Sequence, residues 1–187
     1  MDRGLLTQYS ADHKLSFGDG ASLIALIKSI SDLKGLGDLL ADGTMRASKK
    51  IGNNSEEWAM HVKGLEMPGY EPRGLKTMAL ALAVSTRGAC HNRSSAYEAD
   101  FSEKVDRQQI SEDRGTITAQ SEHFSAIIDS MIWCKFLRKS FNNFYEETSE
   151  IYSLITGVKY DSEKLKKAGE RINNIKKLFN INKEIII

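Results

Sequence analysis

Both prolines of this 187-residue chain, Pro68 and Pro72, lie within one short stretch, residues 64–74. That stretch, GLEMPGYEPRG, also contains three glycines, and its composition is typical of a loop. A proline inside a helix removes a backbone hydrogen bond and clashes with the preceding turn. Because the rest of the chain has no proline, nothing of this kind interrupts helices on either side of residues 64–74.

Three helical segments are expected before this loop. Asp19 can cap a first helix, whose apolar residues recur at helical spacing up to a stop at Gly35. Asp38 can cap a second helix that runs to Gly52, because glycine accepts the left-handed conformation that ends helices. Ser55 can cap a third, short helix with acidic residues in its first turn.

The segments after the loop are also helical in pattern. Residues 75–91 are apolar nearly all round and predict a buried helix, whereas residues 92–118 are polar and predict surface with one short helix. Residues 119–146 predict another helix, followed by a turn at residues 156–157, and Asp161 can cap a final helix. Since there is neither a repeat nor a strand ladder, the expected fold class is all-α, an irregular helical array.

Composition and charge exclude several classes of partner. The chain has 26 basic and 25 acidic residues, which gives no electrostatic case for binding nucleic acid. Its longest apolar run is far shorter than the roughly 20 residues of a membrane span, and its first residues lack a secretory signal. Its two cysteines do not make a disulfide framework. We therefore expect a reducing, cytoplasmic setting with no nucleic-acid or membrane partner.

Charged and ligand-type side chains gather in RGACHNR, residues 87–93. Arg87 and Arg93 are candidate anion-binding residues, because guanidinium groups near buried surface favour phosphate or carboxylate. His91 would share a helix face with Arg87 if the preceding helix extends that far. A histidine at a helix end is more often a hydrogen-bonding or dipole-compensating residue, and the single Cys90 is most often an apolar filler.

A second group of candidates lies in AIIDSMIWC, where Asp129 stands in an apolar surround. A buried carboxylate needs a partner, so Asp129 is either a helix cap or an acceptor for the NH groups of a heterocycle. On a regular helix Asp129 and Cys134 would diverge by about 140°, and they serve neighbouring ligands only if the segment turns or the ligands lie on either side of it. Neither Cys134 nor Cys90 belongs to a CxxC pair, so this chain alone predicts no complete zinc or iron–sulfur site.

Five segments in order resemble the tungsten-containing aldehyde ferredoxin oxidoreductase family. LSFGDGASLIALIKSISDLKGLGDLLADGTMRASKKIG resembles the stretch before the third domain of the family, and HVKGLEMPGYEPRG resembles its VKG-x-E-x-P-x-Y-(D/E)-PRG signature. ALAVSTRGACHNR resembles its A-x-S-x-RG-(A/G)-CH motif, and DSMIWCKF takes the place of D-x-x-G-L-C-x-F. TGVKYDSEKLKKAGERINNIKKLFNIN resembles its TG-x-x-(Y/F)…GERI segment. The resemblance covers nearly the whole chain.

The resemblance implies the C-terminal, helical part of such a protein. Residues 1–66 would match the end of the second domain, and residues 67–187 would match the third domain, which contacts cofactor and cluster. In this family two pterin dithiolenes (molybdopterins) hold one tungsten, and a nearby [4Fe–4S] cluster passes electrons to ferredoxin. An aldehyde and water become a carboxylate. His91 would lie near the metal as a candidate for proton transfer or substrate contact, and Arg87 and Arg93 would bind the anionic parts of the cofactor.

The resemblance gives the DSMIWCKF segment three roles and one departure. Asp129 would bind a pterin, the backbone at Trp133 would contact it, and Cys134 would be one ligand of the [4Fe–4S] cluster. Ile132 and Trp133 stand where the family has Gly-Leu, and glycine permits a backbone conformation that isoleucine resists. The other cluster cysteines of the family lie N-terminal to the matched region. The chain alone is therefore not expected to hold tungsten or the cluster.

Two hypotheses follow from the sequence. The first is the C-terminal portion of a tungstopterin aldehyde:ferredoxin oxidoreductase, as a fragment, a split subunit or a truncated gene product. Its partners would be ferredoxin and the N-terminal half or a partner subunit of the same enzyme, with a homodimer as an open alternative. The second is a non-catalytic helical interaction module, or a truncated remnant of the family that binds no metal. The departure at Ile132 and Trp133 favours the second.

Overall fold

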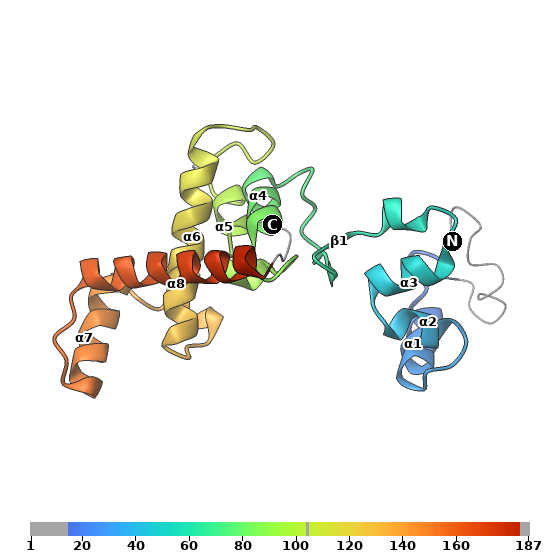
Figure 1. Ribbon diagram of the computed structural model, residues 1–187, viewed down its shortest axis with the longest axis horizontal. Coiled ribbons are helices and arrows are strands. Elements are labelled where there is room, and N and C mark those ends of the chain that lie inside the picture. Colours follow the sequence, from blue (N-terminus) through green and yellow to red (C-terminus); the bar gives the residue numbers. More distant parts are fainter. Residues whose placement is uncertain (1–14, 104, 184–187) are drawn as a thin grey trace. The chain divides into compact units, whose positions relative to one another are not determined.

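The computed structural model describes residues 15–103 and 105–183 (Figure 1). Helices make up most of these residues, and the sheet within them has two strands. The all-α fold class expected from the sequence is therefore confirmed. None of the helices in the described ranges combines the length and the hydropathy that a membrane span requires.

The chain divides into two compact units, the first ending at Met67 and the second beginning at Pro68. The boundary lies inside the proline- and glycine-rich stretch, residues 64–74. Which domains of the family residues 1–66 and 67–187 correspond to stays a prediction.

The first helix among the described residues of the first unit starts where the sequence indicates. The side chain of Asp19 accepts a hydrogen bond from the backbone N–H of Ser22 at 3.0 Å and so caps the helix. The helix ends at Ser31, before the expected stop at Gly35. Leucine side chains from the first two helices and an alanine from the third form the core of this unit. The elements of this unit are α1 (Gly20–Ser31), α2 (Leu36–Ala41), α3 (Thr44–Ile51), η1 (Ser55–Trp58), β1 (His61–Val62) and β2 (Leu65–Glu66).

Two predictions in the first unit were wrong. The single helix expected from Asp38 to Gly52 is split into α2 and α3, because Gly43 adopts a φ of 83° between them. The helix expected from Ser55 is one 3₁₀ turn followed by an antiparallel hairpin. Lys63 and Gly64 both have positive φ between the strands, as the tightest hairpin turns require.

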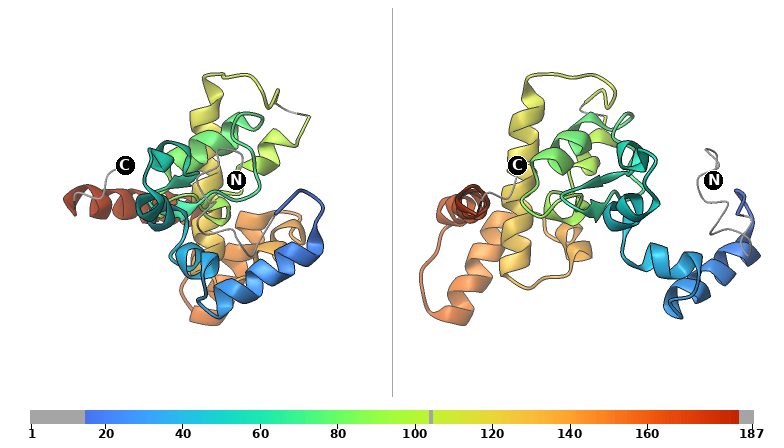
Figure 2. Two further views of the ribbon diagram at one scale, coloured as in Figure 1. Left: turned by 90° about the vertical axis from the view of Figure 1, so that its right-hand side faces the viewer. Right: turned by 45° about the vertical axis from the view of Figure 1, so that its right-hand side comes forward.

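The second unit is built on the crossing of its two longest helices, α6 and α8, seen from three directions in Figures 1 and 2. The closest approach is at Gly169 of α8, where a Cβ atom would lie 2.5 Å from the carbonyl oxygen of His123 in α6. Glycine is required there because the obstacle is backbone. Ile127, Leu165 and Ala168 form the core beside the crossing. The elements of this unit are α4 (Lys76–Val84), η2 (His91–Arg93), α5 (Tyr97–Asp100), α6 (Asp113–Ser130), η3 (Lys135–Lys139), α7 (Phe144–Thr156) and α8 (Ser162–Asn182).

A buried polar network holds the N-terminus of α4. Asp100 accepts hydrogen bonds from the backbone N–H groups of Thr77 at 3.1 Å and Met78 at 2.8 Å. Arg114 of α6 donates to Thr77 Oγ1 at 2.6 Å and lies 3.5 Å from Asp100. The prediction that residues 92–118 are surface was wrong here, since Asp100 and Arg114 are only 3% and 5% exposed. Asp100 supplies the cap that α4 lacks in its own sequence.

The helix bounds in the second unit differ from those expected. The helix predicted for residues 75–91 ends at Val84. The helix predicted for residues 119–146 begins earlier, at Asp113, and is broken after Ser130. The expected end of α7 is confirmed, because Gly157 adopts a φ of 74°, which suits the position after a helix. Likewise confirmed is the cap of α8: Asp161 accepts a hydrogen bond from the backbone of Lys164 at 2.8 Å.

Candidate cofactor-binding site

The chain turns sharply between α4 and the RGACHNR motif. Gly88 has a φ of 108°, which residues with a side chain rarely adopt. Because α4 ends at Val84, the condition under which Arg87 and His91 would share one of its faces is not met. Arg87 is exposed, and no acidic side chain in residues 15–103 or 105–183 forms an ion pair with it. Cys90 is buried, as expected of an apolar filler.

The RGACHNR and DSMIWCKF motifs meet at Asp129. Arg93 Nη1 lies 2.7 Å from Asp129 Oδ2, and Lys135 Nζ lies 2.8 Å from Asp129 Oδ1. Each carboxylate oxygen thus has its own cation. All three side chains are part-buried, which strengthens such pairs relative to fully exposed ones. The carboxylate that sequence reasoning left either as a cap or as an acceptor forms ion pairs with two cationic side chains and accepts a hydrogen bond from Arg93.

A third cation stands beside this pair, Lys176 of α8. Burial lowers the pKa of Lys176 below its usual value, and the charge of Arg93 lowers it further. No carboxylate within the described parts of the chain forms an ion pair with Lys176. Lys135 and Lys176 were missed in the sequence, where each is one of many lysines and nothing in the spacing relates them to Arg93. Arg93, Lys135 and Lys176, with Asp129 between them, are called the cation cluster.

Asp129 lies in the last turn of α6, which ends at Ser130. Trp133 N–H donates to the carbonyl of Ile128 at 3.1 Å, and Ile132 N–H donates to the carbonyl of Asp129 at 3.2 Å. This is the Schellman arrangement, whose C′ residue has positive φ, and Ile132 has a φ of 59°. Isoleucine thus adopts the left-handed conformation at the position where the motif that this segment resembles has glycine. Cys134 lies beyond the turn and is exposed.

Trp133 does not project freely from this turn. Its ring stacks on Phe141 with centroids 4.8 Å apart and meets Phe144 edge-on at 6.0 Å. The indole is therefore engaged with aromatic side chains of its own unit. Its backbone, which the resemblance implicates in pterin contact, closes the turn after α6.

His91 lies in an aromatic group. Its ring centroid is 5.2 Å from that of Tyr70 and 6.2 Å from that of Tyr97, and the two tyrosines stack at 4.3 Å. Burial lowers the pKa of His91, whereas burial and a hydrogen bond with Tyr97 raise the pKa of Tyr70. The imidazole is therefore neutral near pH 7. Tyr70 was missed, although its place in the PGYEPRG motif was a signal that could have found it.

A groove elsewhere in the second unit has a volume of about 500 Å³. Its lining comes from α5, α6, α7, α8 and the segment before α5, with Glu98, Gln120, His123, Tyr145 and Lys166 among its residues. It contains none of the residues that the sequence singled out. The candidate site is therefore the region of RGACHNR and Asp129.

The side chains of the candidate site suit the two groups that the resemblance implies, the pterin and the iron–sulfur cluster, to different degrees. A part-buried acceptor with cations around it, as at Asp129, suits a heterocycle that carries anionic groups. The iron–sulfur cluster is bound by a full set of cysteine thiolates, whereas this chain has two cysteines, of which Cys90 is buried and Cys134 exposed. No group of three or more metal-ligating side chains occurs in the described ranges. Cys134 fits one ligand position, and the others would have to come from another polypeptide segment.

Comparison with known proteins bears on the whole chain. A family model described as aldehyde ferredoxin oxidoreductase, domains 2 and 3, matches residues 1–186. A tungsten-containing aldehyde ferredoxin oxidoreductase of Pyrococcus furiosus is 30% identical over 88% of this chain, and one of Thermococcus kodakarensis is 31% identical over 88%. The WOR-like subunit of an aliphatic sulfonate oxidoreductase of Pyrococcus furiosus is 27% identical over 94% of the chain.

The match covers a minor part of each relative. This chain spans 27% of the length of the first two curated relatives and 26% of the third. The family model matches residues 1–186, so the assignment to the family rests on nearly all residues of this chain. The chain belongs to the aldehyde ferredoxin oxidoreductase family, in the region that the family model describes as domains 2 and 3.

Proposed function

We propose that this chain supplies the C-terminal part of the cofactor site in a tungstopterin aldehyde:ferredoxin oxidoreductase. The single observation that carries the proposal is the contact of Asp129 with Arg93 and Lys135 at 2.7 and 2.8 Å. Two motifs that resemble those of the family, far apart in sequence, thereby present a carboxylate and cations at one place. The chemistry of that set suits a ligand with both NH donors and anionic groups.

In this proposal the chain holds part of the cofactor and needs a second polypeptide segment for the rest. Asp129 accepts from the pterin, Arg87 and Arg93 bind its anionic parts, and the backbone at Trp133 lies against it. When bound, tungstopterin supplies the two-electron redox chemistry that takes an aldehyde and water to a carboxylate. Cys134 provides one thiolate to the [4Fe–4S] cluster, through which electrons leave to ferredoxin.

His91 is proposed to accept a proton or contact the substrate. Because burial lowers its pKa, the ring has an unprotonated nitrogen near pH 7 that can accept a proton. Tyr70 and Tyr97 lie against the ring and restrict its orientation. The reducing, cytoplasmic setting expected from the cysteine content belongs to the same proposal.

The test combines this chain with the N-terminal part of a family member, tungstate and iron during expression. Tungsten and iron are then measured in the purified complex, and reduction of a viologen dye by an aldehyde is followed. We expect His91→Ala to keep the metals and lose dye reduction, and Asp129→Ala to lose tungsten. Absence of tungsten from the wild-type complex would contradict the proposal.

A second candidate function is a non-catalytic helical interaction module descended from the family. Ile132, in the left-handed conformation at a place where the family has glycine, favours it, because the departure removes the residue that best suits the turn. A complex that forms with the N-terminal part yet contains neither tungsten nor iron would support this candidate.

A further inference from the structure

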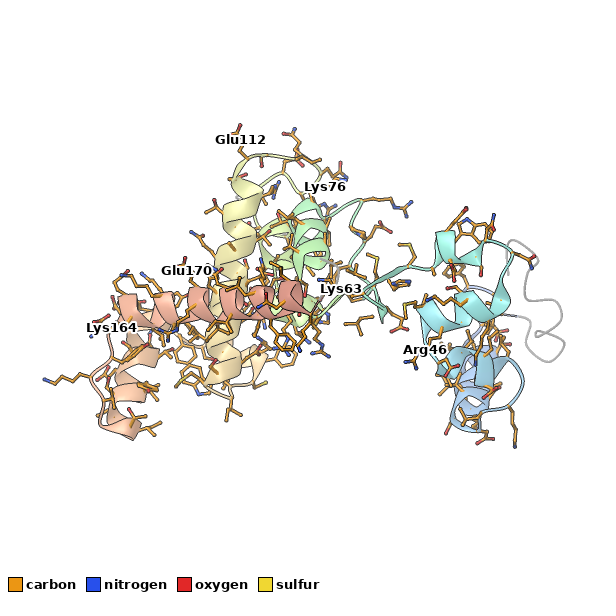
Figure 3. All side chains as sticks on the ribbon, in the orientation of Figure 1. Arg46, Lys63, Lys76, Glu112, Lys164 and Glu170 are labelled. Carbon is orange, nitrogen blue, oxygen red and sulfur yellow. The ribbon has the colours of Figure 1, made fainter. Side chains whose placement is uncertain are left out.

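Near its end, helix α8 buries a polar side chain and exposes apolar ones. Asn180 is 6% exposed, whereas the two residues before it, Leu178 and Phe179, are each 57% exposed. Lys164 and Glu170, labelled in Figure 3, are exposed on the same helix, as charged residues usually are. The burial of Asn180 is therefore not explained by apolar packing of the helix end, and a buried amide needs a hydrogen-bond partner.

The partner of Asn180 is the loop that follows α4. Asn180 Nδ2 donates a hydrogen bond to the backbone carbonyl of Thr86 at 2.8 Å, across 94 positions of the sequence. Thr86 lies two residues after the end of α4 and directly before Arg87. No backbone N–H in residues 15–103 or 105–183 donates to that carbonyl. The side chain of Asn180 thus supplies a donor that the backbone of the loop does not.

The loop between α4 and η2, residues 85–90, is neither helix nor strand. The hydrogen bond from Cys90 N–H to the carbonyl of Gly88 is local and does not fix the loop relative to the helices. Ala89 and Cys90 are buried, so packing holds the second part of the loop, whereas Arg87 is exposed. The bond from Asn180 therefore acts on the part of the loop that packing holds least.

We propose that Asn180 is a positioning residue for the loop that carries Arg87 and leads into His91. Its hydrogen bond ties the carbonyl before Arg87 to α8, which crosses α6 closely at Gly169. The orientation of Arg87 and His91 is thereby set by the helix crossing on which the unit is built. What these two residues do rests on the proposed function, but the positioning is a property of this chain and is measured without cofactor.

The test is limited digestion of the full chain with an arginine-specific protease, with the peptides quantified by mass spectrometry. Asn180→Leu and Asn180→Asp both remove the amide donor, and we expect each to speed cleavage after Arg87 by about fivefold or more. The reason is that proteolysis follows the population of the locally open form. Cleavage after Arg138, whose side chain is 11% exposed in the same unit, reports general unfolding and should change much less.

A second measurement follows the orientation of the loop at His91. NMR titration of the full chain should give His91 a higher pKa in Asn180→Leu than in the wild type, because a released loop exposes the ring to water. Asn173→Leu is the matched control. Asn173 is an asparagine of the same helix, 8% exposed, whose amide nitrogen has no hydrogen-bond partner among the described residues. It should leave both measurements unchanged.

Preferential cleavage after Arg87 together with a raised pKa of His91 would support the positioning role. Unchanged cleavage after Arg87, an unchanged His91 pKa, equal acceleration after Arg87 and Arg138, or an equal effect of Asn173→Leu would each overturn it. Neither measurement uses tungsten or a partner. Failure of metal loading would therefore contradict the proposed function alone, and failure here would contradict the role of Asn180 alone.

Discussion

Asp129 Oδ2 and Arg93 Nη1 are 2.7 Å apart and join segments separated by 36 positions in the sequence. The pair links the last turn of α6 to the η2 turn, which also carries His91. A candidate catalytic histidine, a candidate pterin acceptor and an exposed cysteine thereby belong to neighbouring turns of one unit. The residues of the candidate site therefore all lie in the second unit.

Removing the Asp129 carboxylate should destabilise the fold in a salt-dependent way. Asp129→Ala leaves three cations without their shared partner, and we expect a loss of about 1–3 kcal/mol in the free energy of unfolding. Added salt screens their repulsion and should recover part of that loss. Urea unfolding at low and high salt measures both effects. Asp113→Ala, at an exposed position in the first turn of α6, is the control, and an equal loss in the two variants would contradict the assignment.

Ile132→Gly should stabilise the chain. Isoleucine at a φ of 59° carries the steric cost of a β-branched residue in the left-handed region, about 1–2 kcal/mol. Its side chain is 91% exposed, so removing it loses little packing. We expect the free energy of unfolding to rise by about 1 kcal/mol. Ile110, 85% exposed and without positive φ, is the matched site: a gain from Ile110→Gly as large as that from Ile132→Gly would argue against the strain.

Gly169→Ala should weaken the crossing of α6 and α8. The added Cβ would lie 2.5 Å from the carbonyl oxygen of His123, and backbone cannot move away cheaply. We expect a loss of about 1–3 kcal/mol. Gly115→Ala in α6 meets nothing within 4 Å and should instead add about 0.5–1 kcal/mol through helix propensity. Thermal unfolding of both variants measures the two changes in stability. A change of the same sign in Gly169→Ala and Gly115→Ala would contradict the close approach.

The contributions of the buried residues Asp100 and Arg114 to stability should be coupled. Asp100→Asn leaves Arg114 without its charge partner and weakens the cap of α4, so we expect a loss of about 3–5 kcal/mol. Asp100→Asn together with Arg114→Met should cost less than the sum of the two single changes. Chemical denaturation of the four proteins in this cycle gives the coupling, and strict additivity would show that the groups act independently.

The stability of the chain should fall as the pH drops through the range where histidine titrates. Because burial lowers the pKa of His91 in the folded chain, the unfolded chain takes up a proton at higher pH, about 6.5. The stability contribution of neutral His91 is present above that pH and lost below it. His91→Gln should flatten this part of the pH dependence of unfolding. NMR titration should give His91 a pKa below 6.5, and Tyr70→Ala should raise it; a normal pKa would contradict the burial.

Helix caps and helix ends could be predicted from the sequence where they depend on residues of one segment. Asp19 and Asp161 cap helices as expected, and Gly157 ends α7, since a cap or a glycine acts on its own neighbours. The helix breaks at Gly43 and Ile132 were not recognised. Glycine is only weakly disfavoured inside a helix, and isoleucine is an unusual residue for positive φ.

What the sequence by itself determined is the mainly helical fold, the family and the motif residues Arg93, His91 and Asp129. Only the tertiary structure decided which groups share the candidate site, because pairing across 36 positions depends on where the chain turns. Nothing in the sequence around Lys176 marks it, and the motif that contains Tyr70 does not indicate which residues Tyr70 contacts. Their charge and burial come from packing of distant segments, and electrostatic and aromatic contacts act through space over a few ångströms, with no regard to separation along the chain.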